Sequence, residues 1–418
     1  MKNEEKWDWD TLKKEIPIKE WQENFNWVEE PCVSDDGETI AAIVNTDDAE
    51  FSICVNGEAS EETYEKAWSL RFAPKGEVVA LVANDEEWTV SIGGESWETM
   101  FDYVWDLKIT SDGSFIGAAV QKDGEYGMAV NDTIWDTLYT NISGATLSDQ
   151  GTSAAVVQVL PMGQGDIQGF SAGIFSAAVN GIAQSEKFMN IWDISFDSQG
   201  KQIAYSVRKN RIDYSLVNSN VIWDKNFQFV WQPKFIERDN SLVAPVREGG
   251  KWTLFKDGNP FWEKKYGQLW KLAVHQESGK IAGIISEAFG KWDVTENERS
   301  WGLTCDAMIS DLFYSDNGES LVAVFKNNGC WDIALNGKPW NIRADKLWNP
   351  VVSSNNEILA TRMEKDGKFF LVVNGKVYKE QFDMVFEPAI SPDNDKILLK
   401  SIKSGIYTRQ ILSLDNIL

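Results

Sequence analysis

The sequence contains one histidine and four cysteines in 418 residues, which limits the chemistry that the chain can support. Cys32, Cys54, Cys305 and Cys330 form no C-x-x-C pair, and the sequence has no haem-attachment or zinc-ligand pattern. Haem and iron–sulfur clusters require larger ligand sets than four dispersed thiols and one imidazole. We therefore predict no resident cofactor, no metal site and reduced, buried cysteines. Disulfides Cys32–Cys54 and Cys305–Cys330 stay open as an alternative, since each pair lies within one sequence repeat.

The single histidine also restricts hydrolytic catalysis. A Ser/His/Asp triad would have to use His275, and the sequence has no G-x-S-x-G nucleophile elbow. In the segment LAVHQESGK, His275 has no acid or cysteine at ligand spacing. We therefore expect His275 to be a plain surface residue and predict no catalytic residues.

Long hydrophobic runs and an excess of basic residues are absent as well. The apolar stretches are well short of the roughly 20 residues of a membrane span, and the N-terminus MKNEEKWDWDTLKKE has no signal-peptide core. Asp and Glu number 64 against 40 Lys and Arg, so the net charge is −24, which repels nucleic acid and anionic lipid. These features predict a cytoplasmic chain that does not insert into membranes or bind nucleic acid, whose acidic surface serves solubility or a basic protein partner.

Tryptophan, by contrast, is abundant, with 20 residues. All of them except Trp7 and Trp9 fall in three columns that recur about every 39 residues. The opening column is Trp27, Trp68, Trp105, Trp192, Trp231, Trp270 and Trp348, with Phe386 in register. The middle column is Phe51, Trp88, Tyr126, Phe175, Tyr214, Trp252, Trp292, Trp331, Phe369 and Tyr407. The late column is Trp21, Trp97, Trp135, Trp223, Trp262, Trp301 and Trp340, with Tyr378 in register.

Turn signals between the columns divide each repeat into four strands. Segments such as 34–37 (SDDG) and 111–113 (SDG) follow the opening tryptophan, and an apolar run such as 40–44 comes next. Asn-Gly pairs, as at 56–57 and 180–181, then separate the last two strands and are the strongest short hairpin signal. Four short antiparallel strands in about 39 residues, repeated about ten times, predict an all-β propeller.

We predict one ring over residues 1–418, with repeats opening near 27, 68, 105, 142, 192, 231, 270, 309, 348 and 386. The last repeat runs out after its third strand, whereas the N-terminus holds a spare late tryptophan, Trp21. Residues 1–16 are then an N-terminal extension, and residues 17–24 are a closure strand that completes the last blade. Two five-bladed rings would need a linker and a second closure, and the sequence has neither.

The regular period of the tryptophans favours a packing role. Blades that stack around an axis need large apolar side chains at matching positions, and one buried indole contributes about 4–6 kcal/mol of gross transfer free energy. An electron relay would instead group the aromatic residues along one side. We therefore expect all three columns to fill the space between blades.

Two resemblances follow from these residues. The strings SDDGETIAAIV, SDGSFIGAAV and SPDNDKILLK resemble the repeats of TolB-like propellers, which implies the fold alone. The whole chain is similar to the TmcD family, the tryptophan-rich cytoplasmic D subunits of the Tmc transmembrane electron-transfer complex of sulfate-reducing bacteria. The residues that carry this similarity are the segment IWDTLYTNISG, the VNGxxW-like segment at 335–340, and the pairs Trp97/Trp105, Trp262/Trp270 and Trp340/Trp348.

The second resemblance implies an accessory subunit that carries no redox cofactor. Its partners would be a membrane cytochrome b, an iron–sulfur protein and a periplasmic multihaem cytochrome, with the chain peripheral at the inner face of the membrane through those partners. The favoured function is therefore a non-catalytic scaffold that holds protein partners. The alternatives are a propeller-type hydrolase or lyase that uses channel-mouth carboxylates, and a propeller that binds a small ligand or peptide.

Two segments depart from the repeat and are candidate partner contacts. The insertion LPMGQGDIQGF, residues 160–170, places Met162, Ile167 and Phe170 in a glycine-rich loop between two strands. Trp7 and Trp9 precede the closure strand and lie outside the three columns. Loops on rigid scaffolds often carry function, so both segments are interaction candidates, with a mobile loop and an added rim strand as the alternatives.

Overall fold

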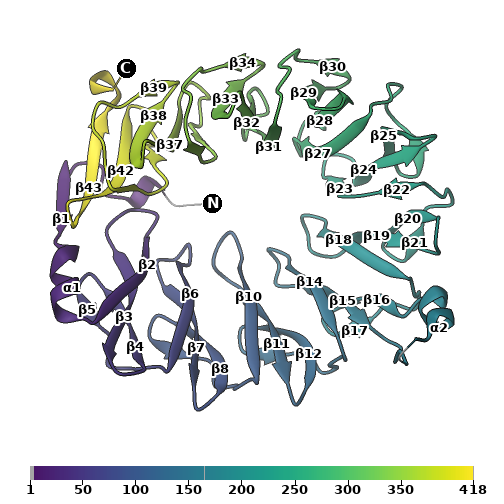
Figure 1. Cartoon of the computed structure of the whole chain (residues 1–418), viewed down its shortest axis with the longest axis horizontal. Coiled ribbons are helices and arrows are strands. Elements are labelled where there is room, and N and C mark those ends of the chain that lie inside the picture. The colour runs from purple at the N-terminus through teal and green to yellow at the C-terminus, as the bar shows by residue number, and fades with distance from the viewer. Residues whose placement is uncertain (1–3, 164, 418) are drawn as a thin grey trace. The chain divides into compact units, whose positions relative to one another are not determined.

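The computed structural model describes residues 4–163 and 165–417, and they form ten antiparallel sheets of four or five strands (Figure 1). The predicted all-β propeller of ten repeats is confirmed. Helical segments are short: η1 (Glu4–Lys6), η2 (Ile18–Glu20), α1 (Trp21–Asn24), α2 (Ile167–Ala172) and η3 (Leu414–Asn416). The chain divides into two compact units, unit 1 (Met1–Trp97 and Cys305–Leu418) and unit 2 (Glu98–Thr304). The prediction of a single ring stays a prediction.

Unit 1 holds five of the sheets. Two of them come from its N-terminal part: β2 (Trp27–Val33), β3 (Ile40–Asp47), β4 (Glu50–Val55), β5 (Glu58–Ala59); and β6 (Lys66–Phe72), β7 (Val78–Asn84), β8 (Glu87–Ile92), β9 (Glu95–Ser96). Two come from its C-terminal part: β31 (Met308–Tyr314), β32 (Leu321–Asn327), β33 (Cys330–Leu335), β34 (Lys338–Pro339); and β35 (Lys346–Leu347), β36 (Val351–Val352), β37 (Leu359–Lys365), β38 (Lys368–Val373), β39 (Lys376–Val377). The fifth joins both ends of the chain: β1 (Lys13–Ile16), β40 (Met384–Val385), β41 (Ala389–Ile390), β42 (Lys396–Lys403) and β43 (Ile406–Ser413).

Unit 2 holds the other five sheets. The first three are β10 (Tyr103–Ile109), β11 (Ile116–Lys122), β12 (Glu125–Val130), β13 (Thr133–Ile134); β14 (Ile142–Leu147), β15 (Ser153–Gln158), β16 (Phe175–Val179), β17 (Ile182–Ala183); and β18 (Asn190–Phe196), β19 (Ile203–Arg208), β20 (Tyr214–Asn218), β21 (Val221–Ile222). The last two are β22 (Phe229–Val230), β23 (Lys234–Ile236), β24 (Ser241–Glu248), β25 (Lys251–Lys256), β26 (Asn259–Pro260); and β27 (Gln268–Val274), β28 (Ile281–Ala288), β29 (Lys291–Glu296), β30 (Arg299–Ser300). In both units each predicted opening residue lies in the first strand of its sheet or directly after it.

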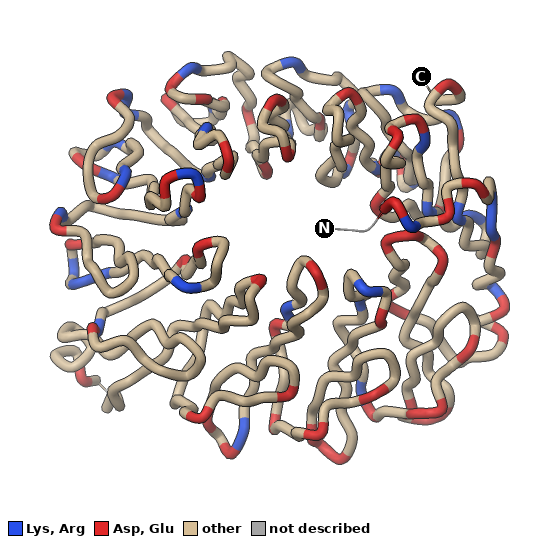
Figure 2. Tube along the Cα trace, turned by 180° about the vertical axis from the view of Figure 1, so that it is seen from behind, with Lys and Arg blue, Asp and Glu red and all other residues tan. Residues whose placement is uncertain are grey.

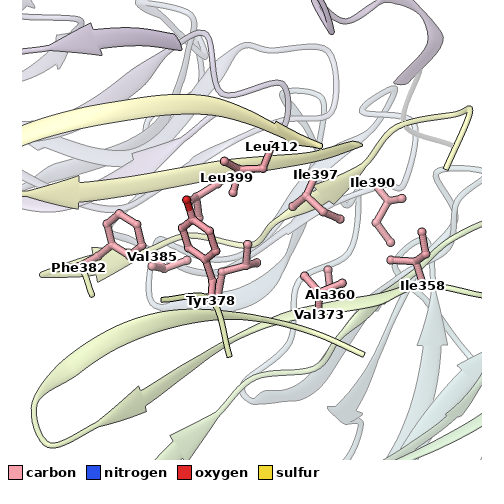
Figure 3. Close-up of a cluster of buried hydrophobic side chains, with 11 residues drawn as sticks. Ile358, Ala360, Val373, Tyr378, Phe382, Val385, Ile390, Ile397, Leu399 and Leu412 are labelled. Atoms are coloured by element: carbon pink, nitrogen blue, oxygen red, sulfur yellow. The ribbon is translucent and has the colours of Figure 1, made fainter. Parts of the chain in front are cut away.

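The second strand of each sheet is buried on both faces, which explains its continuous apolar sequence. In β3 the first six residues are all buried, and β7 repeats this pattern. Small and β-branched residues dominate these strands because neighbouring sheets pack against both faces. Figure 3 shows one such interface in unit 1, where Ile358, Ala360 and Val373 face Ile397 and Leu399. Packing between sheets is therefore the main source of core burial.

The Asn-Gly turns do more than reverse the chain. Asn180 has a φ of 46°, and its side-chain oxygen accepts a hydrogen bond from the Ser153 main-chain N–H at 2.9 Å. This bond ties the outer hairpin of the sheet to the start of its second strand. The following Gly181 has a φ of 80°, and a Cβ there would lie 3.0 Å from the Cβ of Trp135 in the preceding sheet. Glycine thus supplies both the positive φ and the room for a late-column tryptophan.

The chain ends meet in one sheet of unit 1, as the sequence predicts, although the closure strand itself was placed wrongly. The strand is β1, which pairs antiparallel with β43 from Lys13 opposite Gln410 to Ile16 opposite Tyr407 (Figure 1). Residues 17–24 are not a strand; they contain η2 and α1. Pro17 has no main-chain N–H to extend the ladder, so the strand ends at Ile16. The residues 1–16 therefore include the closure strand.

Three long side chains of the last sheet fasten it to the first hairpin of unit 1. Lys400 Nζ donates to the Asp35 carbonyl at 2.9 Å, and the Tyr407 hydroxyl donates to the Gly37 carbonyl at 2.7 Å. Arg409 Nε donates to the Asp36 carbonyl at 3.1 Å. Together with the paired strand β1, these bonds join the first and last repeats within this unit.

Candidate functional site

The three aromatic columns differ in burial, and this difference locates the candidate site. In the late column Trp135 is 6% exposed, and its indole N–H donates to the Ser153 hydroxyl at 2.8 Å. In the opening column no tryptophan is fully buried, and Trp27 and Trp270 are 49% and 46% exposed. The opening tryptophans therefore fill the space between blades only in part: Trp192 and Trp231 pack against core clusters, and each indole keeps one part in solvent.

A bulge in the first strand explains why the opening tryptophans are only half buried. In β18 the pairing with β19 shifts between Trp192 and Ser195, and Asp193 between them has a φ of 54°. Similar shifts occur in β6 after Trp68 and in β10 after Trp105. A bulge re-aims the neighbouring side chain, which leaves the indole at this position only partly buried.

The bulge also links neighbouring sheets through a carboxylate. Asp193 Oδ2 accepts a hydrogen bond from the Gln232 main-chain N–H at 2.8 Å, 39 residues further along the chain. Glu30 Oε2 accepts the corresponding bond from Leu70 N–H at 3.0 Å in unit 1. These carboxylates therefore have a structural role in joining successive repeats.

In unit 2 the opening residues of three successive sheets surround one pocket. Its volume is about 360 Å³, and it is lined by Asn190, Trp192, Asp193, Arg208, Tyr214, Phe229, Trp231, Gln232 and Trp270. The tryptophans belong to β18, to the segment after β22, and to β27. Five of the nine lining residues are aromatic, and a volume of this size is in the range of small-ligand sites.

The aromatic walls are held by contacts with one another. Trp231 stacks on Trp252 with ring centroids 4.7 Å apart, and it meets Trp270 edge to face at 5.0 Å. The Trp231 indole N–H donates to the Leu269 carbonyl at 3.0 Å. On the other side, Phe229 lies 5.7 Å from Trp192. Because Trp231 is held by two rings and a hydrogen bond, this wall of the pocket is preorganised.

Two charged groups line the same pocket. The Arg208 guanidinium lies 5.6 Å from the Tyr214 ring, and its Nε and Nη2 donate to the carbonyls of Asn210 and Arg211 at 3.1 and 2.8 Å. Although part of Asp193 is exposed, the protein around its carboxyl removes water and raises the pKa above its usual value. The Gln232 N–H and the charge of Lys234 act in the opposite direction and lower that pKa.

At the opening position of another sheet in unit 1, a protein side chain covers the indole instead. The Arg362 guanidinium lies 4.7 Å from the Trp348 ring and donates to the Val385 carbonyl at 2.7 Å. Burial lowers the pKa of this guanidinium. In the pocket of unit 2 the guanidinium lies over Tyr214 instead, and Trp270 stays 46% exposed.

The candidate contacts predicted from the sequence lie elsewhere. Trp7 and Trp9 stack on each other at 6.1 Å and pack on a cluster of the last sheet, so they are half buried. In the insertion, Met162 is 51% and Ile167 65% exposed, whereas Phe170 at the end of α2 is half buried. Neither segment contributes to the aromatic pocket, and their role as partner contacts stays a prediction.

Sequence reasoning missed the pocket. Trp192, Trp231 and Trp270 were identified only as packing residues, because their period is the same as that of the buried columns. A signal was present in Asp193 and Gln232, since each polar residue directly follows an opening tryptophan. Such a residue marks the position beside a partly buried indole.

The other reactive side chains serve structural roles. His275 is buried rather than on the surface, because its Nδ1 pairs with the Ser278 hydroxyl at 2.7 Å and accepts from the Ser278 N–H at 3.2 Å in a tight turn. All four cysteines are free, so the disulfide alternative is not seen. Burial raises the pKa of Cys32 to about 12 and of Cys54 to about 11, which disfavours the reactive thiolate.

Within residues 4–163 and 165–417, no group of three or more His, Cys, Asp or Glu is arranged to hold a metal ion. In the same ranges, no helix has the length and apolar character to cross a bilayer.

A second pocket, of about 810 Å³, lies in unit 1 and brings Glu4, Glu5 and Glu387 to the turns that precede β37 and β42.

No protein-family model matches the chain, and no curated protein sequence matches it. Among solved structures, a eukaryotic initiation factor is similar over 91% of this chain and 90% of its own, with 13% identity and a TM-score of 0.46. The propeller domain of the Trilobed protease from Pyrococcus furiosus covers 75% and 94%, with 12% identity and a TM-score of 0.33. Dihydro-heme d1 dehydrogenase NirN covers 80% and 77%, with 11% identity and a TM-score of 0.38. The strand pairing of this chain is therefore the evidence that places it in the β-propeller class.

Proposed function

We propose that this chain is a non-catalytic propeller that binds a protein partner through the aromatic pocket of unit 2. The observation that carries the proposal is the pocket shared by Trp192, Trp231 and Trp270, with Trp270 46% exposed. Exposed aromatic clusters of this kind are costly in water and mark interaction sites. Tryptophan is also among the residues that contribute most to binding free energy at interfaces.

The acidic surface supports the same role. In residues 34–97 the basic side chains are Lys66, Arg71 and Lys75, and acidic residues far outnumber them. Figure 2 shows acidic residues at the loops of these first two sheets. A field of one sign steers a partner of opposite charge and speeds association. The pocket and the acidic loops therefore serve different steps, the first holding a partner and the second attracting it.

The resemblance to the TmcD family suggests which partners to test. They are the membrane cytochrome b and iron–sulfur subunits of a respiratory electron-transfer complex, with this chain peripheral at the inner membrane face. In this proposal the chain contributes binding surfaces and carries no redox cofactor.

The experiment is co-purification of tagged full-length chain from native cells, with Trp270→Ala compared with wild type. We expect the variant to lose its partners and keep its fold. Trp27→Ala is the matched control, because Trp27 is equally exposed but lies in unit 1. Equal recovery of partners by all three proteins contradicts the proposal.

The hydrolase or lyase alternative has one supporting observation, the pocket that Glu4, Glu5 and Glu387 line. Such an enzyme needs two carboxylates directed at one substrate, and calcium is a cofactor to test with it. A rise in melting temperature with Ca²⁺ that Glu387→Gln abolishes would favour this alternative.

A further inference from the structure

The charged groups of the aromatic pocket differ in how far they are free to form a hydrogen bond with a ligand. Asp193 already accepts a hydrogen bond from Gln232 N–H and lies near Lys234. Arg208 donates through Nε and Nη2 to the loop carbonyls, and among residues 4–163 and 165–417 its Nη1 has no hydrogen-bond partner. The pocket therefore offers the Nη1 donor of Arg208, whereas one oxygen of its carboxylate, Oδ2 of Asp193, already accepts a hydrogen bond.

The surrounding charges favour the same sign of ligand. Lys209 and Arg211 follow Arg208 in the loop before β20, and Lys271 follows Trp270 in β27. These basic residues adjoin the lining residues Arg208 and Trp270 in the sequence, so their charge opposes the entry of a cation, even though indole faces attract cations in other settings. An anion instead gains a charge-assisted hydrogen bond from a planar guanidinium, the geometry that arginine forms best with carboxylates.

We infer that this pocket binds a planar aromatic ring that carries, or lies beside, a carboxylate. The ring lies against Trp192, Trp231 and Trp270, and the carboxylate accepts from Arg208. Two sources share this chemistry, a free aromatic acid and the C-terminal aromatic residue of a partner protein. The inference rests on the proposed function, because it names the group that the interaction pocket recognises.

The test uses isothermal titration calorimetry of the full chain with three probes that share a ring: naphthylacetate, naphthylacetamide and naphthylethylamine. We expect the acetate to bind roughly tenfold more tightly than the amide, because its carboxylate makes a charge-assisted hydrogen bond to the guanidinium and the amide carbonyl makes a weaker, neutral one. The amine should bind most weakly. Equal binding of the three probes, or tightest binding of the amine, overturns the inference.

Two variants assign the effect to named side chains. Arg208→Gln should remove the advantage of the acetate and leave the amide unchanged, whereas Trp270→Ala should weaken both probes. Trp27→Ala should change neither. If Arg208→Gln keeps the full preference for the acetate, the inference is wrong even when Trp270→Ala fails to fold.

A comparison of two peptides distinguishes a free aromatic acid from the C-terminal aromatic residue of a partner protein. An acetylated tripeptide that ends in phenylalanine is compared with its C-terminal amide. A free-acid peptide that binds more tightly than naphthylacetate indicates a partner's C-terminus, and a weaker one indicates a small aromatic acid. Loss of partners from Trp270→Ala in cells, without any preference for the acetate, refutes this inference and leaves the proposed function standing.

Discussion

Arg409 is the largest side chain that is fully buried in the described part of the chain. Its guanidinium donates to the main-chain carbonyls of Asp8, Thr11 and Asp36, and it forms an ion pair with Glu38 at 2.8 Å. A buried cation is costly unless such partners surround it. Since these partners come from the N-terminal segment and the first hairpin, this one side chain connects both with the last sheet.

Replacing Arg409 tests its role directly. Arg409→Met leaves the three carbonyls without their donor and Glu38 with Lys14 as its remaining partner, and we expect a loss of about 3–5 kcal/mol of unfolding free energy. Urea denaturation measures it. Lys13→Met on the exposed side of β1 is the control and should cost less than about 1 kcal/mol. An equal, small effect of both substitutions would contradict the account.

Tyr407 makes the contact between the last sheet and the first hairpin sensitive to alkaline pH. Burial raises the pKa of its phenol above the usual value near 10, so the folded state favours the neutral form. The stability that it contributes is present below about pH 10 and is lost as the pH rises further. Tyr407→Phe should therefore cost about 1 kcal/mol at neutral pH but flatten the alkaline decline. Denaturation curves from about pH 8 to about pH 11 test this, and an unchanged slope argues against it.

At the scale of elements, β1 protects the edge of β43. Both strands belong to unit 1, and their pairing covers four residues of each. Without β1 the outer edge of β43 would expose unpaired main-chain groups, which promote aggregation. The N-terminal segment is thus a structural element of the last sheet, although it lies at the other end of the sequence.

Deletion of residues 1–16 should lower the melting temperature and cause aggregation at concentrations where wild type forms no aggregates. Size-exclusion chromatography and thermal melting follow both effects. The double variant Trp7→Ala/Trp9→Ala retains β1 and isolates the stacked pair. If it aggregates as strongly as the deletion, the indoles rather than the strand protect the edge.

The insertion between β15 and β16 is an element whose function is separable from stability. Met162→Asp and Ile167→Asp should change the unfolding free energy by less than about 0.5 kcal/mol, because both side chains are exposed. If this loop docks a partner, the double variant loses that partner in co-purification. Ile182→Asp, exposed on β17 of the same sheet, is the control. Retention of every partner would remove the insertion from the candidate contacts.

The elements were predictable because their signals are local. Asn180 and Gly181 define a turn within two residues, and the period of the late column locates the last strand of each sheet. The closure strand was misplaced because Trp21 follows the repeat, whereas Pro17 ends the ladder before it. The pocket was not predictable, since it depends on the bulge at Asp193 and on side chains from three sheets.

At the scale of the whole molecule, the two units differ in the surface that they offer. Unit 1 contains the acidic stretch 34–97 and the paired chain ends, and unit 2 contains the aromatic pocket. A binding protein needs attraction and then retention, which long-range charge and a desolvated aromatic cluster supply in turn. We propose that the acidic stretch attracts a partner and that the aromatic pocket retains it.

Oxidative footprinting of indoles by mass spectrometry tests that claim most directly, comparing the purified full-length chain with the complex isolated from native cells. We expect Trp231 and Trp270 to become protected in the complex, whereas Trp27, which is about as exposed as Trp270 in the free chain, keeps its reactivity. Protection of Trp27 with no change at Trp231 and Trp270 would contradict it.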